Sequence, residues 1–230
     1  MEEDKDDVFL EKSDDIIEEL RQFYEIEDLD KGEQNAEGLP QKMFRWLVCG
    51  PSGCGKTNHI IKLLLRNELK HDKLYIFARD VFETKYATIA AHYAHMAEQA
   101  GVDVGDILEI GNTAEMIVHP DDLDKSISNL VIFDDFVANK EADKIIAEHF
   151  LRGRKQNTNY IYITQSFYGT PKVIRINCNY FSCYRLGSPK ELRLIYSDTS
   201  ATMTPEEFKA KYDEAVSEPY GFYFAHMNME

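Results

Sequence analysis

From Met43 onward, two kinds of apolar pattern alternate along the chain. Short apolar runs predict strands at 43–49, 73–79, 129–135, 159–165, 179–186, 191–197 and 220–227. Apolar residues at helical spacing predict helices at 56–67, 83–99, 142–152 and 204–215, with Thr204 as the cap of the last. Such alternation predicts an α/β fold with a mainly parallel central sheet and helices on both faces.

Charge divides the chain into two parts. Residues 1–40 carry 16 acidic and 4 basic side chains, whereas residues 41–230 carry 25 acidic and 22 basic ones. We therefore predict an acidic arm at 1–40 and one folded domain at 41–230. A helix at 13–29 with Ser13 as its cap either docks on the body of the protein or on a partner, or belongs to a solvated, partly disordered tail. Because the net charge of −15 resides mostly in the arm, it does not exclude a DNA partner.

Three further features bound the environment of the protein. Its four cysteines lack the paired spacing of a zinc site, which favours reduced thiols in an intracellular compartment. Since no apolar run has the length of a membrane span and no signal peptide is evident, we expect a soluble protein without membrane insertion. His92 and His95 share a predicted helix, but without further ligands nearby we expect a solvated helix face rather than a metal site.

The segment WLVCGPSGCGKT joins a predicted strand to a predicted helix and contains the phosphate-binding pattern G-x-x-x-x-G-K-[ST]. Its glycines allow a tight turn in which backbone N–H groups and the positive helix end face an anion. Lys56 is expected to reach the β and γ phosphates, and the Thr57 hydroxyl to ligate Mg²⁺. The predicted nucleotide-binding residues are Gly50, Pro51, Ser52, Gly53, Cys54, Gly55, Lys56 and Thr57.

Acidic and amide side chains follow two other predicted strands. NLVIFDD ends in Asp134, assigned to Mg²⁺ through a bridging water, and Asp135, the candidate base or water-orienting group for hydrolysis. NYIYITQ ends in Gln165, and ligands of open α/β sheets gather at the carboxyl edge of the strands. If this strand lies between the other two, the Gln165 amide points at the γ-phosphate. The segment NKEAD has one residue too many for the guanine-reading N-K-x-D pattern, so we favour ATP over GTP.

Basic residues cluster in FLRGRKQN, between the two acids and the glutamine. Arg152, Arg154 and Lys155 either complement the end of a helix or supply an arginine finger to a transferring phosphoryl group. Neither arginine is close to the phosphate loop along the chain. We therefore expect the finger to act on the nucleotide of a neighbouring subunit, which requires a homo-oligomeric ring.

Residues 43–226 resemble the poxvirus-type genome-packaging ATPases of the FtsK/HerA superfamily, found in large eukaryotic DNA viruses, virophages and some archaeal viruses. The resemblance rests on GPSGCGKT, VIFDD, FLRGRKQNTNYIYITQSFYGTPKVIRINCNYF and EPYGFYF. It implies that the Gln165 strand lies between the strand that precedes the phosphate loop and the strand that ends in Asp134. It also implies that an arginine just before the Gln165 strand is the finger that acts on the neighbouring subunit. Asp135 stands where the superfamily usually has glutamate, and the acidic arm is not part of the family core.

The function implied by this resemblance is ATP-driven packaging of double-stranded DNA into a preformed capsid, with capsid or portal-vertex proteins as partners. The expected location is the host cytoplasm or viral factory, with possible association with the virion. Lys155, Lys172 and Arg175 are candidates for DNA phosphate contacts, and Tyr168 for stacking. Two alternatives stay open: a P-loop kinase for a nucleoside or small metabolite, and a nucleotide-dependent regulatory switch that binds a partner through its acidic arm.

Overall fold

The computed structural model describes residues 35–41, 43–136, 140–152, 157–200 and 202–227. The predicted acidic arm and its Ser13-capped helix therefore lie outside the described residues, except for 35–40. Arg154, Lys155 and the Asn139 region fall outside them as well.

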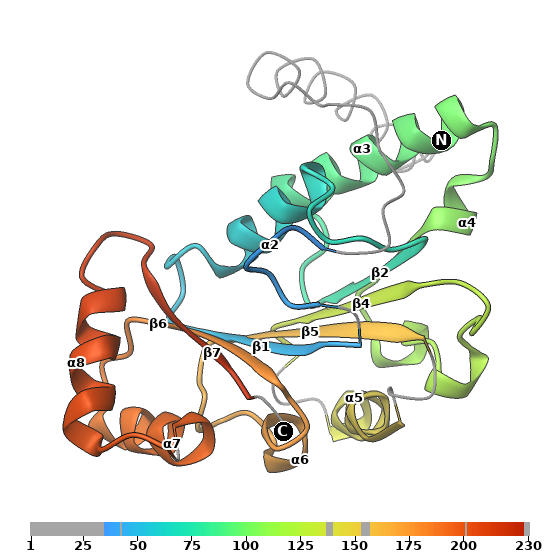
Figure 1. Cartoon of the computed structure of the whole chain (residues 1–230). Helices are drawn as coiled ribbons and strands as arrows, with labels where there is room; N and C mark the ends of the chain where they lie inside the picture. The colour runs from blue at the N-terminus through green and yellow to red at the C-terminus, as the bar shows by residue number, and fades with distance from the viewer. Residues whose placement is uncertain (1–34, 42, 137–139, 153–156, 201, 228–230) are drawn as a thin grey trace.

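A seven-stranded sheet forms the centre of the described structure, in the order β3-β2-β4-β5-β1-β6-β7 (Figure 1). Its strands are β1 (Arg45–Cys49), β2 (Lys73–Ala78), β3 (Leu108–Gly111), β4 (Asn129–Asp134), β5 (Thr158–Thr164), β6 (Tyr180–Tyr184) and β7 (Phe222–His226). All neighbouring strands are parallel except β7, which pairs antiparallel with β6. The predicted α/β fold with a mainly parallel sheet is confirmed, and β5 does lie between β1 and β4.

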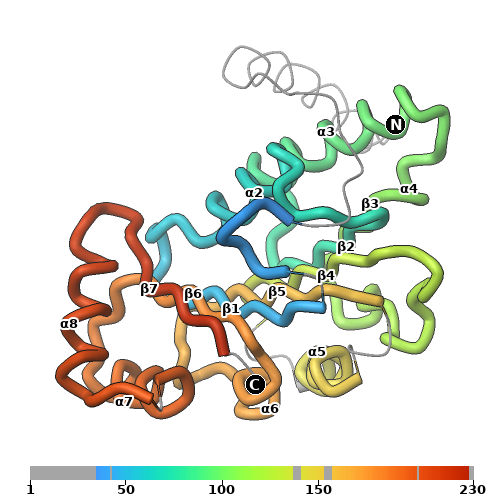
Figure 2. The backbone as a smooth tube through the Cα atoms, viewed as in Figure 1, coloured from blue at the N-terminus to red at the C-terminus, as the bar shows by residue number. Residues whose placement is uncertain are grey.

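Helices cover both faces of this sheet (Figures 1 and 2). Two long helices, α2 (Lys56–Leu65) and α3 (Thr84–Ala100), lie on one face, while α5 (Lys140–Arg152), α7 (Pro189–Thr199) and α8 (Pro205–Ala215) lie on the other. Short helical turns complete the connections: α4 (Val104–Ile107), α6 (Lys172–Arg175), Ala114–Met116 and Pro120–Asp122. Among the described residues, no helix has both the length and the apolarity needed to cross a membrane.

The sheet separates two apolar cores because successive strand residues point to opposite faces. In β1, Leu47 and Cys49 enter the core beneath α5, α7 and α8, whereas Trp46 and Val48 enter the core beneath α2 and α3. All five residues of β1 are buried, which explains why its sequence reads as a continuous apolar run rather than an alternating one. This central, doubly covered strand leads directly into the glycine-rich loop that precedes α2.

One predicted strand is wrong: residues 191–197 lie inside helix α7. The alternation of Leu192 and Leu194 suggested a strand, but Pro189 occupies the first helical turn, where its missing N–H costs nothing. Ile195 and Thr199, four residues apart, are the buried pair of the helix and fix its inner face. By contrast, the predicted Thr204 cap is confirmed: its side chain accepts a hydrogen bond from Glu207 N in a reciprocal capping box.

His92 also departs from expectation, since it is buried in α3 rather than solvated, and burial lowers its pKa to about 4. His95 is partly exposed. No group of three or more potential metal-ligating side chains occurs in the described parts of the chain. The four cysteines are unpaired, and burial raises the pKa of Cys49, Cys178 and Cys183, so these three thiols serve as core residues.

Candidate nucleotide-binding site

The phosphate loop spans the gap between the end of β1 and the start of α2, and two of its glycines are required by its geometry. Gly55 has φ 96, a left-handed conformation that side-chain-bearing residues rarely adopt. A Cβ on Gly50 would lie 2.6 Å from Cβ of Tyr184 on the neighbouring strand β6. The loop can therefore form only with glycine at these positions, and it leaves its backbone open to a ligand.

Lys56 lies at the first position of α2 with its side chain folded over the loop. Its Nζ donates hydrogen bonds to the carbonyl oxygens of Gly50 at 2.7 Å and Pro51 at 2.9 Å. The residue is only 8% exposed, so the ammonium group lies against the loop rather than in bulk water. A positive charge at the N-terminus of a helix, beside an open turn of backbone, is suited to an anionic phosphate.

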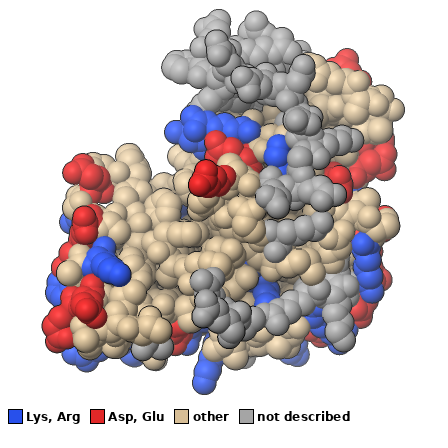
Figure 3. All heavy atoms as spheres, viewed as in Figure 1, with Lys and Arg blue, Asp and Glu red and all other residues tan. Residues whose placement is uncertain are grey.

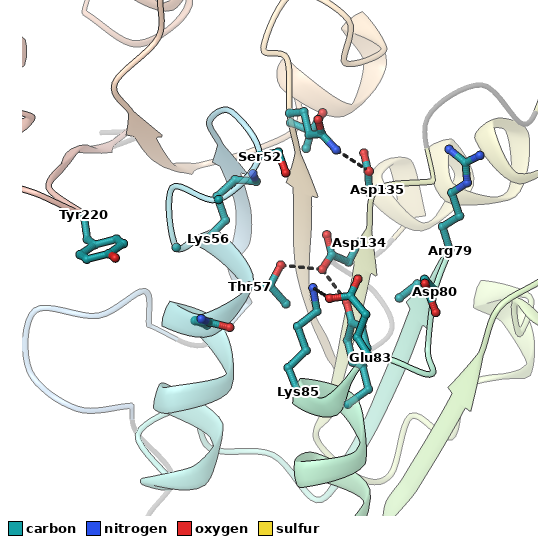
Figure 4. A pocket seen from close by; sticks show the side chains of 17 residues that line it. Ser52, Lys56, Thr57, Arg79, Asp80, Glu83, Lys85, Asp134, Asp135 and Tyr220 are labelled. Carbon is teal, nitrogen blue, oxygen red and sulfur yellow. Dashed lines mark hydrogen bonds and ion pairs between the residues drawn. The ribbon is translucent and has the colours of Figure 1, made fainter.

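Asp134, the last residue of β4, meets α2 and α3 at the floor of the site (Figure 4). One of its carboxylate oxygens, Oδ2, accepts hydrogen bonds from Thr57 Oγ1 at 2.7 Å and from the Tyr86 hydroxyl at 2.5 Å. The carboxylate is 6% exposed. The predicted pair of Mg²⁺ ligands, Thr57 and Asp134, is thus brought together, and Tyr86 is a third oxygen that the sequence analysis missed.

Opposing influences act on the pKa of the Asp134 carboxyl group. Burial raises the pKa of its carboxyl group, whereas the hydrogen bonds from Tyr86 and Thr57 and the nearby Lys85 ammonium oppose that shift. Lys85 itself is held by Glu83, with Nζ 2.8 Å from Oε2. A buried carboxylate beside two hydroxyl oxygens suits a divalent cation, because a hard cation prefers oxygen ligands.

Asp135 follows in a left-handed conformation, with φ 56, which aspartate tolerates better than most residues. Its backbone N–H still donates to Ile163 O of β5 at 3.1 Å, so the strand pairing continues to this point. The turn directs the carboxylate towards the end of β5, where Oδ2 accepts a hydrogen bond from Gln165 Nε2 at 2.7 Å. Two side chains predicted separately from sequence therefore form a contacting pair at the carboxyl edge of the sheet.

A pocket of about 480 Å³ joins these groups and lies within the size range of small-molecule sites. Lys56, Thr57, Asp134, Asp135 and Gln165 all line it. The donor set fits a magnesium nucleotide: open loop backbone and an ammonium group for phosphate, oxygen atoms for the cation, and an acid–amide pair beyond them. When bound, Mg²⁺ offsets phosphate charge and fixes the orientation of the phosphate chain.

Arg152, the candidate arginine that the structure describes, lies away from this pocket. Arg152 is the last residue of α5. Two residues earlier, Phe150 O accepts a hydrogen bond at 2.9 Å from the guanidinium of Arg45, the first residue of β1. The end of α5 is therefore at the amino edge of the sheet, opposite the phosphate loop. Arg152 donates to Asp121 Oδ2 at 2.7 Å and does not line the pocket. The other candidate, Arg154, falls outside the described residues.

Of the candidate DNA contacts, Arg175 is not free to serve. Its Nε donates to Asp198 Oδ2 at 3.0 Å, Nη1 donates to Thr170 O at 2.7 Å, and the side chain is 10% exposed. The expectation that Arg175 contacts phosphate is therefore corrected: its charge fastens α6 to α7. Lys172 and Tyr168, in contrast, are exposed, and the Lys190 ammonium lies 3.7 Å from the centre of the Tyr168 ring.

Sequence reasoning missed several residues that line the pocket, among them Lys85, Tyr86 and Tyr220. Lys85 and Tyr86 follow β2, and only the pairing of β2 with β4 brings them to Asp134. Tyr220 belongs to EPYGFYF, in which the sequence analysis predicts the start of a closing strand but no site residue. Its signal was its position directly before Gly221, in a turn between a helix and a closing strand.

Comparisons with known proteins show which proteins the chain resembles. Residues 32–204 match the family described as Poxvirus A32 protein. The chain is 25% identical over 152 residues to the DNA packaging protein OPG160 of vaccinia virus (strain Copenhagen), covering 65% of this chain and 56% of that protein. The monkeypox virus protein of the same name is also 25% identical, with 50% of its length covered. The chain thus spans about half the length of the curated relatives it matches.

A solved structure shares the fold: the genome packaging NTPase B204 from Sulfolobus turreted icosahedral virus 2 in complex with sulfate, with a TM-score of 0.51. Sequence identity is 15%, and the match covers 80% of this chain and 92% of the viral protein.

Proposed function

The chain belongs to the Poxvirus A32 protein family, and we propose that it is an ATPase that drives double-stranded DNA into a viral capsid. One observation carries the proposal: the phosphate loop, the two acids after β4 and the glutamine after β5 line one pocket at the carboxyl edge of the sheet. Residues 41–230 would act as one ATPase domain, with 1–40 as an acidic arm. The curated relatives are named DNA packaging proteins, which supports the choice of substrate.

Each group has a role that follows from its position. The backbone N–H groups of the loop, which Pro51 lacks, and the Lys56 ammonium bind the phosphates of ATP, and Thr57 with Asp134 would hold Mg²⁺. Asp135 orients the attacking water and accepts its proton. Gln165 fixes the Asp135 carboxylate through their 2.7 Å hydrogen bond and faces the same water. Aspartate is one methylene shorter than the glutamate usual at this position in the superfamily. The hydrogen bond from Gln165 would hold the Asp135 carboxylate in a fixed position despite that shorter side chain.

An arginine finger in this scheme comes from the neighbouring subunit of a homo-oligomeric ring. The support is the position of α5, which ends at the sheet edge opposite the phosphate loop. An arginine at that edge is far from the nucleotide bound by its own chain. Because Arg152 is engaged with Asp121 and Glu148, a trans role for it requires breaking that ion pair, which favours Arg154.

Mixing inactive subunits tests the shared site. A mixture of Lys56→Ala and Arg154→Ala chains should recover hydrolysis that neither variant shows alone, because some interfaces then combine an intact loop with an intact finger. No recovery, with both variants still assembling, would rule out a trans finger at Arg154. A parallel mixture with Arg152→Ala reports on the other candidate.

Duplex DNA would approach near the loop that follows Gln165. In that loop, Ser166 donates a hydrogen bond to Glu191 Oε1 at 2.5 Å, and Tyr168 carries the Lys190 ammonium on its ring. Lys172 adds a second exposed cation at α6. Phosphate contacts need charge rather than base reading, so such cations suffice for a motor that moves any sequence.

The surface of α8 is unsuited to DNA. Carboxylates gather over α8 (Figure 3), whose exposed acids are Glu206, Glu207, Asp213 and Glu214. Replacing Lys172 and Lys190 with alanine should therefore reduce stimulation by duplex DNA while sparing basal turnover. The matched control replaces Lys209 and Lys211 of α8 and should leave stimulation unchanged. Equal stimulation in both double variants would remove Lys172 and Lys190 from the DNA interface.

The proposed function itself is tested by measuring phosphate release with and without long duplex DNA. We expect duplex DNA to raise turnover of the wild-type chain, and Asp135→Asn to abolish most of it while retaining ATP binding. A parallel screen for nucleoside phosphorylation addresses the kinase alternative. Phosphate transfer to a nucleoside, with no effect of duplex DNA, would overturn the motor and favour a kinase. Turnover indifferent to every polymer would favour a regulatory switch.

A further inference from the structure

Tyr220 is an aromatic side chain displayed in the wall of the nucleotide pocket. It is 72% exposed, and of the exposed large apolar side chains in the described part of the chain it alone lines the pocket. Water is a poor environment for so large an apolar surface, and most tyrosines in the described part of the chain are buried instead. We therefore expect a ligand to cover the exposed ring.

The backbone holds Tyr220 at a cost. Its φ is 65, a left-handed conformation that is unfavourable for an aromatic residue and ordinary for glycine. The next residue, Gly221, donates its N–H to Glu218 O at 3.1 Å, and a Cβ there would lie 2.4 Å from Ala215 O. The turn between α8 and β7 is thus closed tightly behind Tyr220. Strain maintained at an exposed pocket residue is typical of ligand sites.

Position decides which part of a nucleotide the ring would meet. A Cβ placed on Gly55, the last residue before α2, would lie 3.0 Å from Cδ1 of Tyr220, so the ring stands beside the end of the phosphate loop. Figure 4 shows Tyr220 on one side of Lys56 and Thr57, with Asp134 and Asp135 on the other. If the terminal phosphate faces the acids, the sugar and base leave the loop on the Tyr220 side.

We propose that Tyr220 is the platform on which the nucleobase stacks. This inference rests on the proposed nucleotide site and adds to it the part that recognises the base. An aromatic face stacks on any base, and a purine offers the larger surface. Tyr220 therefore selects nucleotides over bare polyphosphate, and it does not by itself distinguish ATP from GTP.

The experiment compares ATP with inorganic tripolyphosphate, which has the phosphates without the base. Both are titrated calorimetrically, with Mg²⁺, into the full chain and into Tyr220→Gly, a substitution that suits the positive φ. Loss of one stacked base should weaken ATP binding by roughly ten-fold or more. Tripolyphosphate binding should be unchanged, and Tyr220→Phe and Tyr220→Trp should bind ATP as wild type does. Phe82→Gly, at a site 75% exposed but outside the pocket lining, serves as the matched control.

Two results would overturn the platform. Tyr220→Gly could bind ATP as tightly as wild type, or it could lose ATP and tripolyphosphate equally, in which case the ring only shapes the loop at Gly55. Failure of the nucleotide site itself looks different: the wild-type chain would bind neither ligand, or Lys56→Ala would bind both normally. Every variant is checked for unchanged far-ultraviolet circular dichroism before titration.

Discussion

Removing the charge of Asp135 should slow hydrolysis more in the wild-type chain than in a chain that already lacks the Gln165 amide. The reason is their 2.7 Å hydrogen bond, in which a carboxylate accepts from an amide. Asparagine at 135 keeps the acceptor geometry and tolerates the positive φ, so Asp135→Asn removes charge without straining the turn. Gln165→Ala removes the donor.

The structure sets the size of the expected coupling. A hydrogen bond to a charged group contributes about 1.5–3 kcal/mol and one between neutral groups about 0.5–1.5 kcal/mol. Gln165 is exposed, which favours the lower ends of these ranges, so the charge-dependent part is about 1 kcal/mol, or roughly a factor of five in rate.

Single-turnover hydrolysis at saturating ATP measures this coupling for the wild type, both single variants and the double variant. The double variant should be about fivefold faster than the product of the two single losses predicts, well outside the ~0.3–0.5 kcal/mol scatter of independent sites. ATP affinity, measured alongside, should change little. Losses that multiply without interaction would show that the two side chains do not act as a pair during hydrolysis.

Three further outcomes follow from the same contacts. Gly55→Ala should cost about 1–2 kcal/mol of folding stability and weaken ATP binding. Gly101→Ala, also at positive φ but with open space around it, should lose stability without losing ATP affinity. Equal ATP affinity in the two variants would be inconsistent with the loop geometry. Tyr86→Phe removes a hydroxyl from Asp134, so the Mg²⁺ concentration needed for half-maximal turnover should rise several-fold, and an unchanged Mg²⁺ titration would count against this role. Burial lowers the pKa of His149 from 6.5 to about 4. Between these two pH values the unfolded chain binds a proton at His149 that the folded chain does not, so folding stability should fall as pH drops from 6.5 to 4. Thermal melts of His149→Gln should show a weaker pH dependence, and an identical one would refute the assignment.

Much of the site was readable from sequence because its chemistry is local. The phosphate loop, the acids after β4 and the glutamine after β5 each follow a strand directly, and parallel strands bring such residues to one edge. The strand order that makes Asp135 and Gln165 neighbours came from the family resemblance, and the structure confirms it. Their direct hydrogen bond could not be foreseen, since it depends on the positive φ at Asp135.

Other features escaped because they depend on tertiary contacts. Tyr86 reaches Asp134 only because β2 pairs with β4, a neighbour relation that no local pattern encodes. Arg175 looked like an exposed cation in a basic stretch, yet its guanidinium is buried against Asp198 and the 165–170 loop. The segment 191–197 read as a strand because alternating leucines outweighed the helical spacing of its buried residues.

Movement along duplex DNA is measured most directly by displacement of a triplex-forming strand. The wild-type chain, supplied with ATP, Mg²⁺ and a duplex that carries a third strand at one end, should release that strand. Lys56→Ala should release none, and neither should the wild type with a non-hydrolysable ATP analogue. Rapid ATP hydrolysis stimulated by the duplex, with the third strand left in place, would contradict translocation.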